Sequence, residues 1–172
     1  SSTNNLLDGV RVSAGMELDM TTNYAATRIA GSLVLDGTAT LNEEARLIFN
    51  ADAGGQTLGG TGTMQFTSPD YQDPSRVYID GDTTLTIASG ITLISNGYAD
   101  IGAAYSISGI DTIINQGTIR SENAGSRSTT IRSDAFSNEN LVEALSGGRI
   151  YVTSSDLTNT GTIRAVGDGV VD

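Results

Sequence analysis

Apolar and polar residues alternate with a period of two over short stretches along most of the chain, and Gly, Asn, Asp and Ser separate these stretches. Three stretches in the C-terminal third superpose without gaps: residues 115–120 (NQGTIR), 138–143 (NENLVE) and 159–164 (NTGTIR). They start 23 and 21 residues apart. A repeat of this length is too short to form its own core, so it predicts a solenoid of stacked coils.

Each copy fits one corner and one strand of a parallel β-helix coil, in which equivalent residues of successive coils lie about 4.8 Å apart. Asn suits the corner, because it tolerates left-handed backbone angles and its amide can bond the Asn of the next coil. The Gly or Asn two positions later also adopts positive φ at little cost. The predicted corner columns are Asn115, Asn138 and Asn159, followed by Gly117, Asn140 and Gly161.

The alternation after each corner predicts one buried column and one outward column. The buried aliphatic column consists of Ile119, Val142 and Ile163. The outward column consists of Arg120, Glu143 and Arg164, with charges that alternate in sign from coil to coil. Exposed contacts in such a ladder contribute about 0.2–1 kcal/mol each, so we expect it to set the register rather than to hold the fold.

A second pattern, aliphatic-x-Gly-x-x-Thr-aliphatic, occurs at residues 35–41, 58–64, 79–85 and 107–113. Its steps of 23, 21 and 28 residues predict a similar coil length in the N-terminal half. The chain is therefore predicted to be all-β, a single-stranded right-handed parallel β-helix of roughly seven to eight coils of about 22 residues in one domain, 1–172.

Two stretches are less certain in their local structure. Residues 133–145 (SDAFSNENLVEAL) contain helix-forming residues and could form a short amphipathic helix, although the threefold alignment favours a strand. Residues 1–8 are polar and predict a loose lead-in to first strands at residues 10–14 and 16–20.

Composition and charge restrict the partners of this chain. The net charge is −11, and all nine basic residues are Arg. Nucleic acid and anionic membrane surfaces are poor partners for such a chain, because the phosphate term would be repulsive. Cys and His are absent, which excludes disulfides, thiolate metal sites and the commonest general base. No apolar run approaches the roughly 18–20 residues that span a bilayer, so we expect no membrane insertion.

The repeats at residues 113–119 (IINQGTI), 145–152 (LSGGRIYV) and 157–165 (LTNTGTIRA) resemble the β-helical passenger regions of bacterial autotransporters and filamentous-haemagglutinin-type adhesins. The resemblance extends from about Gly31 to the C-terminus. It implies a segment of a longer secreted protein, located extracellularly or on a bacterial cell surface. The function that it implies is that of a structural or adhesive scaffold without catalysis.

An enzyme is the main alternative, because pectin-degrading lyases and hydrolases share this architecture. Such enzymes need clustered carboxylates with a basic residue nearby. The nearest candidates are Asp80 and Asp82 with Arg76, but Asp-Gly pairs form turns first. We therefore predict no catalytic residue, no cofactor and no metal ligand set. A calcium-dependent polysaccharide-binding or polysaccharide-degrading protein remains the alternative, since acidic loops suit calcium.

The loop at residues 68–76 holds both prolines, and loops that leave a solenoid often form its binding surface. A second such loop is predicted at residues 121–128. The candidate binding residues of the first loop are Asp70, Tyr71, Asp73 and Arg76. Glycans on a host or neighbouring cell are candidate partners, because sugar faces pack on tyrosine rings. The other tyrosines that could line a glycan groove are Tyr78, Tyr98, Tyr105 and Tyr151.

Two further expectations concern the threonines and the ends. Thr-x-Thr recurs at residues 38–40, 61–63 and 84–86, and flat arrays of this motif occur in β-solenoid ice-binding proteins, which makes ice binding a less favoured alternative. Residues 165–172 follow a full repeat and include no amphipathic helix that could cap the stack. We therefore expect the chain to continue, or copies to stack end to end into filaments.

Overall fold

The structure is a computed structural model that describes residues 5–103, 109–122, 125 and 127–172, and these residues form strands and turns but no helix. The strands are β1 (Asn5–Val12), β2 (Glu17–Met20), β3 (Ala26–Leu35), β4 (Thr38–Leu41), β5 (Arg46–Phe49), β6 (Gln56–Gly59), β7 (Thr63–Phe66), β8 (Ser75–Ile79), β9 (Thr83–Ile87), β10 (Thr92–Ser95), β11 (Ala99–Ala103), β12 (Asp111–Asn115), β13 (Thr118–Ser121), β14 (Ser128–Arg132), β15 (Ala135–Asn138), β16 (Leu141–Leu145), β17 (Arg149–Val152), β18 (Asp156–Asn159), β19 (Thr162–Val166) and β20 (Val170–Val171).

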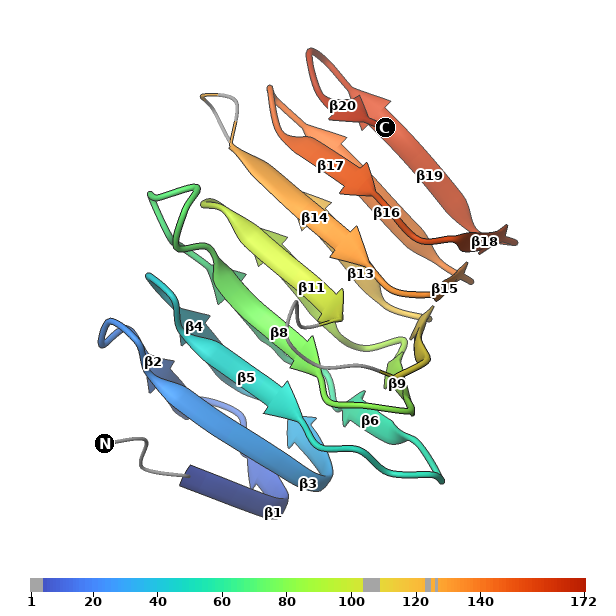
Figure 1. Ribbon diagram of the computed structural model, residues 1–172. Coiled ribbons are helices and arrows are strands. Elements are labelled where there is room, and N and C mark those ends of the chain that lie inside the picture. The colour runs from blue at the N-terminus through green and yellow to red at the C-terminus, as the bar shows by residue number, and fades with distance from the viewer. Residues whose placement is uncertain (1–4, 104–108, 123–124, 126) are drawn as a thin grey trace.

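The strands stack in three parallel faces around one bore (Figure 1). Face 1 consists of β5, β8, β11, β14, β17 and β20, face 2 of β6, β9, β12, β15 and β18, and face 3 of β2, β4, β7, β10, β13, β16 and β19. The long strand β3 bends around the corner, because its first half pairs with β5 and its second half with β6. β1 pairs along β3 in the same way.

This arrangement confirms the predicted all-β parallel solenoid, with about 7 turns spaced about 23 residues apart. The coils wind with a right hand from the N-terminus toward the C-terminus (Figure 1). No helix that could span a membrane occurs in the part of the chain that the structure describes. Residues 133–145 form β15 and β16 rather than a helix. Residues 1–8 were predicted to be a loose lead-in, but β1 already begins at Asn5.

The bore is filled by inward side chains at alternate positions of each strand. Its largest fully buried members are Phe49, Phe66, Phe136, Ile29, Leu33, Leu35, Leu41, Leu47, Leu58, Met64, Ile79 and Leu85. Full burial of one such side chain stabilises the fold by about 1.5–3 kcal/mol. Because the side chains of neighbouring coils complete this burial, the stability of each coil depends on the coils above and below it.

The N-terminal alignment of the second pattern is wrong in its first two steps. Leu58 pairs with Leu33 rather than with Leu35, and Ile79 pairs with Phe49 on another face. The third step is right, since Leu85 pairs with Ile113. The motif fails because a three-faced coil has three corners, and each corner accepts Gly. A short Gly-centred pattern therefore matches corners that do not stack on one another.

The glycines of the C-terminal repeat are needed for a different reason from the one predicted. Neither Gly117 nor Gly161 has positive φ, and neither do the corner asparagines. A Cβ on Gly117 would lie 2.5 Å from the carbonyl oxygen of Ile91, and a Cβ on Gly161 would lie 2.2 Å from that of Asn140. These distances are too short for any side chain, so the close approach of successive coils selects Gly.

Candidate functional site

Asn115, Asn138 and Asn159 form one column at the end of β12, β15 and β18, as the repeat predicts. The side-chain amide nitrogen Nδ2 of Asn115 donates to Oδ1 of Asn138 at 2.8 Å. That of Asn138 donates to Oδ1 of Asn159, also at 2.8 Å, and to the carbonyl oxygen of Thr162 at 3.1 Å. The ladder therefore ties each corner to the next strand, which gives it a structural role.

The aliphatic column lies beside this ladder in β13, β16 and β19. Ile119 and Val142 are fully buried. Ile163 was predicted to be buried as well, but it is only half-buried and packs against the core from one side. The reason is that β19 is the outermost strand of face 3 in the described part of the chain, so Ile163 is covered by a strand on one side only.

The charged column is more buried than predicted. Glu143 is 1% exposed and accepts hydrogen bonds from Arg120 Nε at 2.6 Å and from Arg164 Nε and Nη2 at 2.9 and 2.6 Å. Burial alone would raise the pKa of Glu143, but the hydrogen bonds from Arg164 and Arg120 outweigh it and lower the pKa. Arg120 and Arg164 are partly exposed, at 32% and 54% of their side chains, so only the carboxylate of this column is buried. The expected small surface contribution does not apply to Glu143, because losing either arginine would leave a buried charge with fewer partners.

The predicted binding loop lies between β7 and β8, but its four candidates do not converge. The Asp70 carboxylate accepts the backbone N–H of Gln72, and the Asp73 carbonyl oxygen accepts the Ser68 hydroxyl, so both shape the loop. Arg76 is buried and pairs with Glu44 at 3.2 Å. Only Tyr71 contributes its side chain to an open site.

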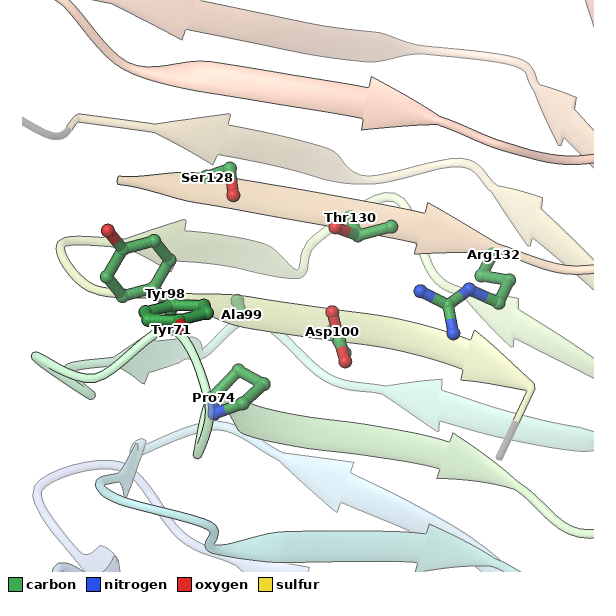
Figure 2. Close-up of a pocket in the computed structure, with 8 residues that line it drawn as sticks. All are labelled: Tyr71, Pro74, Tyr98, Ala99, Asp100, Ser128, Thr130 and Arg132. Atoms are coloured by element: carbon green, nitrogen blue, oxygen red, sulfur yellow. The ribbon is translucent and has the colours of Figure 1, made fainter. Parts of the chain in front are cut away.

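That site is a pocket of about 200 Å³ on the outside of face 1, which we call the tyrosine pocket. It spans three coils and lies along β11 (Figure 2). Its lining residues are Tyr71, Pro74, Tyr98, Ala99, Asp100, Ser128, Thr130 and Arg132. Figure 2 shows the two tyrosines at one end, Arg132 at the other and Asp100 between them.

The aromatic end of the tyrosine pocket comes from two elements. Tyr71 stands on the loop before β8, and Tyr98 comes immediately before β11. Their ring centroids lie 6.3 Å apart at an interplanar angle of 66°, an edge-to-face pair. The isolated bridge between Ser68 and Tyr98 holds the loop against β11. Tyr71 remains 69% exposed, so most of its ring faces solvent.

The polar end of the pocket is electrostatically balanced. Asp100 stands in register with Arg76 below it and Thr130 above it. Burial raises the pKa of Asp100, while the charges of Arg132 and Arg76 and the hydrogen bond with Thr130 oppose this rise. The Asp100 carboxylate can accept hydrogen bonds from a polar ligand, and the Thr130 hydroxyl, which donates to this carboxylate, can accept one as well. A guanidinium group such as that of Arg132 can donate hydrogen bonds.

The other sequence candidates lie apart from this pocket. The ring centroid of Tyr78 lies 6.0 Å from the Cζ atom of the Arg76 guanidinium. Tyr151 lies one coil further on, in register with Thr130. Tyr105 lies outside the described residues. The three Thr-x-Thr motifs do not form a flat array, because Thr38 pairs with Thr63 and Thr40 with Gln65.

The acidic candidates of the enzyme alternative do not meet Arg76. Asp80 pairs instead with Arg28 at 2.5 Å, and Asp82 accepts the backbone N–H of Ile110 at 2.7 Å. Within the described residues, no three carboxylates come close enough together to hold a metal ion. These contacts assign Asp80 and Asp82 to the structure of the corner between faces 1 and 2.

Asp111, which the sequence did not single out, is a buried acid at this corner. It is 2% exposed, and its Oδ1 has no hydrogen-bond partner among the residues that the structure describes. Burial, together with the charges of Asp134, Asp82 and Asp80, raises the pKa of Asp111 to about 6. Between pH 3.8, the ordinary pKa of an aspartate, and about pH 6, Asp111 therefore keeps its proton in the folded state and loses it in the unfolded state.

We expect Asp111→Asn to change the pH dependence of stability. A raised folded-state pKa means that stability is highest below the unfolded pKa and falls as pH rises toward about 6. The loss amounts to about 3 kcal/mol at most, and the neutral amide of the variant avoids it. Urea unfolding should show the variant more stable than the wild type at pH 7.5 but not at pH 4. Equal differences at both pH values, or the same pattern in the exposed control Asp168→Asn, would contradict this.

Sequence analysis named Tyr71, Tyr98 and the loop that contains Tyr71, and Ser128 ends its second predicted loop, but it missed Asp100, Thr130 and Arg132. These residues come from two strands whose neighbourhood depends on coil register. Comparison with known proteins finds no matching family model, no matching curated protein and no matching solved structure.

Proposed function

We propose that this chain is an extracellular or bacterial cell-surface scaffold, of structural or adhesive kind, whose β-solenoid extends end to end, through flanking segments or through copies that stack into filaments. The observation that carries the proposal is the match between the residues of the first described coil and those of the last one. The proposal includes no catalytic step, no cofactor and no nucleic-acid or membrane partner. The net charge of −11 supports the exclusion of nucleic acid and anionic membranes as partners. The resemblance of the repeats to secreted adhesins supports the scaffold function.

The C-terminal end leaves core positions uncovered. Leu157 is in register with the buried Phe136 of the preceding coil, yet it is 50% exposed. Ile163, in register with the buried Val142, is half-buried. In Figure 1 these strands, β18 and β19, form the outermost coil together with β20. An apolar bore with an open strand edge favours the addition of another coil.

The N-terminal end presents the complementary surface. Leu7, Val10 and Leu18 pack against the core from one side and are not fully buried. In β2, the outward residues Glu17 and Asp19 flank Leu18. A second copy could therefore place its first coil on the last coil of the first copy, with apolar residues facing each other in the bore.

Register within face 3 predicts which residues would meet. If β2 of one copy continues the ladder beyond β19 of another, Leu18 lies over Ile163 and Asp19 over Arg164. Asp19 would then continue the column in which Arg120, Glu143 and Arg164 already alternate in sign. Glu17 would lie over Thr162, and inside the chain the Thr40 hydroxyl already donates to Glu17 at 2.7 Å.

Stacking has to overcome repulsion between two chains of the same charge. At physiological ionic strength the Debye length is about 8 Å, so distant charges are largely screened, whereas contacts in the interface are not. A coil of parallel hydrogen bonds and a continuous apolar bore provide the attraction, and the pairing of Asp19 with Arg164 sets the register.

We expect Asp19→Arg to weaken self-association. The substitution places a positive charge opposite Arg164, although it also reduces the net negative charge of the copy. Glu139→Arg is the matched control, because it changes the net charge equally at an exposed site on the side of the stack. Sedimentation velocity over a concentration series should show growing oligomers for the wild type and for the control, and a shift toward monomer for Asp19→Arg.

A strictly monomeric wild type over the whole series would contradict the stacking proposal. So would equal association of Asp19→Arg and the wild type, since the copies would then meet through another surface. Circular dichroism of each variant shows whether the β-solenoid is retained, so that loss of folding is not taken for loss of stacking.

A further inference from the structure

We infer that the tyrosine pocket binds a neutral saccharide, with one sugar ring against Tyr71 and its hydroxyl groups on Asp100 and Thr130. This inference goes beyond the scaffold proposal and does not depend on stacking, because the pocket lies on the outer face and not at an end. If both are right, the site supplies the adhesive contact of the scaffold.

The aromatic end supplies the surface that a sugar ring needs. The C–H groups of a pyranose pack on aromatic rings, while the hydroxyls remain at its edge for hydrogen bonds. Tyr71 makes an edge-to-face contact with Tyr98, yet it remains 69% exposed. Together with Pro74, Tyr98 and Ala99, Tyr71 makes this end of the pocket apolar, and an apolar pocket with a few convergent polar groups is typical of ligand sites.

The polar end supplies hydrogen-bond groups at the other side of the same space (Figure 2). The Asp100 carboxylate is an acceptor for sugar hydroxyls, the Thr130 hydroxyl, which donates to Asp100, can accept from one, and the Arg132 guanidinium is a donor. These groups lie on the neighbouring strands β11 and β14. The pocket volume of about 200 Å³ is below the range for drug-sized ligands and suits a single ring, with further rings lying outside it.

The charges around the pocket favour a neutral ligand. An anionic sugar would approach the Asp100 carboxylate and a chain of net charge −11. A cationic ligand such as a quaternary ammonium would fit the two tyrosines, but it would meet Arg132 and, one strand below Asp100, Arg76. The negative charge of Asp100 and the positive charges of Arg132 and Arg76 offset each other. The pocket is therefore polar without strongly favouring either sign of ligand charge.

The test is a titration of the full chain with cellobiose, maltose, lactose and N,N′-diacetylchitobiose. Binding can be followed by saturation-transfer NMR and by tyrosine fluorescence, because the chain contains no Trp. We expect saturable binding of at least one disaccharide. Tyr71→Ala and Asp100→Asn should each weaken it by about tenfold or more. Tyr24→Ala is the matched control, since Tyr24 is about as exposed as Tyr71 and does not line the pocket.

Three results would overturn the inference. The first is the absence of saturable binding of all four disaccharides at tens of millimolar. The second is equal binding by Tyr71→Ala and the wild type, or equal loss in Tyr24→Ala. The third is saturable binding of tetramethylammonium with no binding of the sugars, which would indicate an aromatic site for cations. Monomer and oligomer fractions tested separately distinguish failure of this site from failure of stacking.

Discussion

Replacing Val142 by Asp is expected to unfold the coils around β16. Val142 is 0% exposed and lies in register between Ile119 and Ile163. An aspartate there would place an unpaired charge in the bore. It would therefore either bind a proton or cause the coil that contains it to unfold. We expect a loss of about 4 kcal/mol or more, which is a large fraction of the stability of a domain.

Urea unfolding followed by circular dichroism measures this loss. Val166→Asp is the matched control, because Val166 is exposed on the outside of β19 and the same substitution there buries no charge. The control should lose less than about 1 kcal/mol. Similar stability of Val142→Asp and the wild type would mean that β16 does not face the bore.

Asn138→Asp is expected to have the second-largest effect, although the two side chains have the same shape. Asn138 is fully buried and donates to Asn159 and to the carbonyl oxygen of Thr162. An ionised carboxylate has no hydrogen to donate, and it would face both of these oxygens inside the fold. We expect a loss of about 3 kcal/mol or more at pH 7.

The same change at the exposed end of the ladder provides the control. Asn159 accepts the hydrogen bond from Asn138, and a carboxylate can accept it equally well, so Asn159→Asp should cost little. Acidification should restore much of the stability of Asn138→Asp, because the protonated carboxyl regains one donor. A loss that is equal for the two variants, or independent of pH, would show that the ladder does not bear on stability.

The C-terminal register could be predicted because its signal is unusual. Asparagines at one corner, two of them fully buried, select one another through side-chain hydrogen bonds, so three copies are enough to align the coils. The N-terminal half has no such ladder, and its inward positions accept any aliphatic residue. Leu33 and Leu35 fit the bore equally well, so the sequence does not distinguish the true partner of Leu58 from its neighbour.

The burial of Glu143 and the composition of the tyrosine pocket have no counterpart in local sequence patterns. The two-residue period places Glu143 on the outside of its strand, but Arg120 and Arg164 cover it from the coils on either side. Asp100 and Arg132 are brought to one pocket by the pairing of β11 with β14. Both features depend on contacts between neighbouring coils. These contacts are set by the register of the strands, which the pattern within a single strand does not reveal.

The most direct test of the account is a set of distances along one column of face 3. Glu17, Thr38 and Thr63 lie six, five and four coil steps from Thr162 in this column. Because the chain has no cysteine, pairs of introduced cysteines can carry spin labels at Thr162 and at each of the three positions in turn.

Pulsed electron paramagnetic resonance of the three labelled pairs should give backbone separations of about 29, 24 and 19 Å, apart from a common offset for the label tethers. The samples are diluted with unlabelled protein so that only distances within one copy are measured. A decrease of about 4.8 Å per coil step is the result that the stacked register predicts. Equal distances for the three pairs, or an increase from Glu17 to Thr63, would contradict the stack and with it the paired ends and the pocket built across three coils.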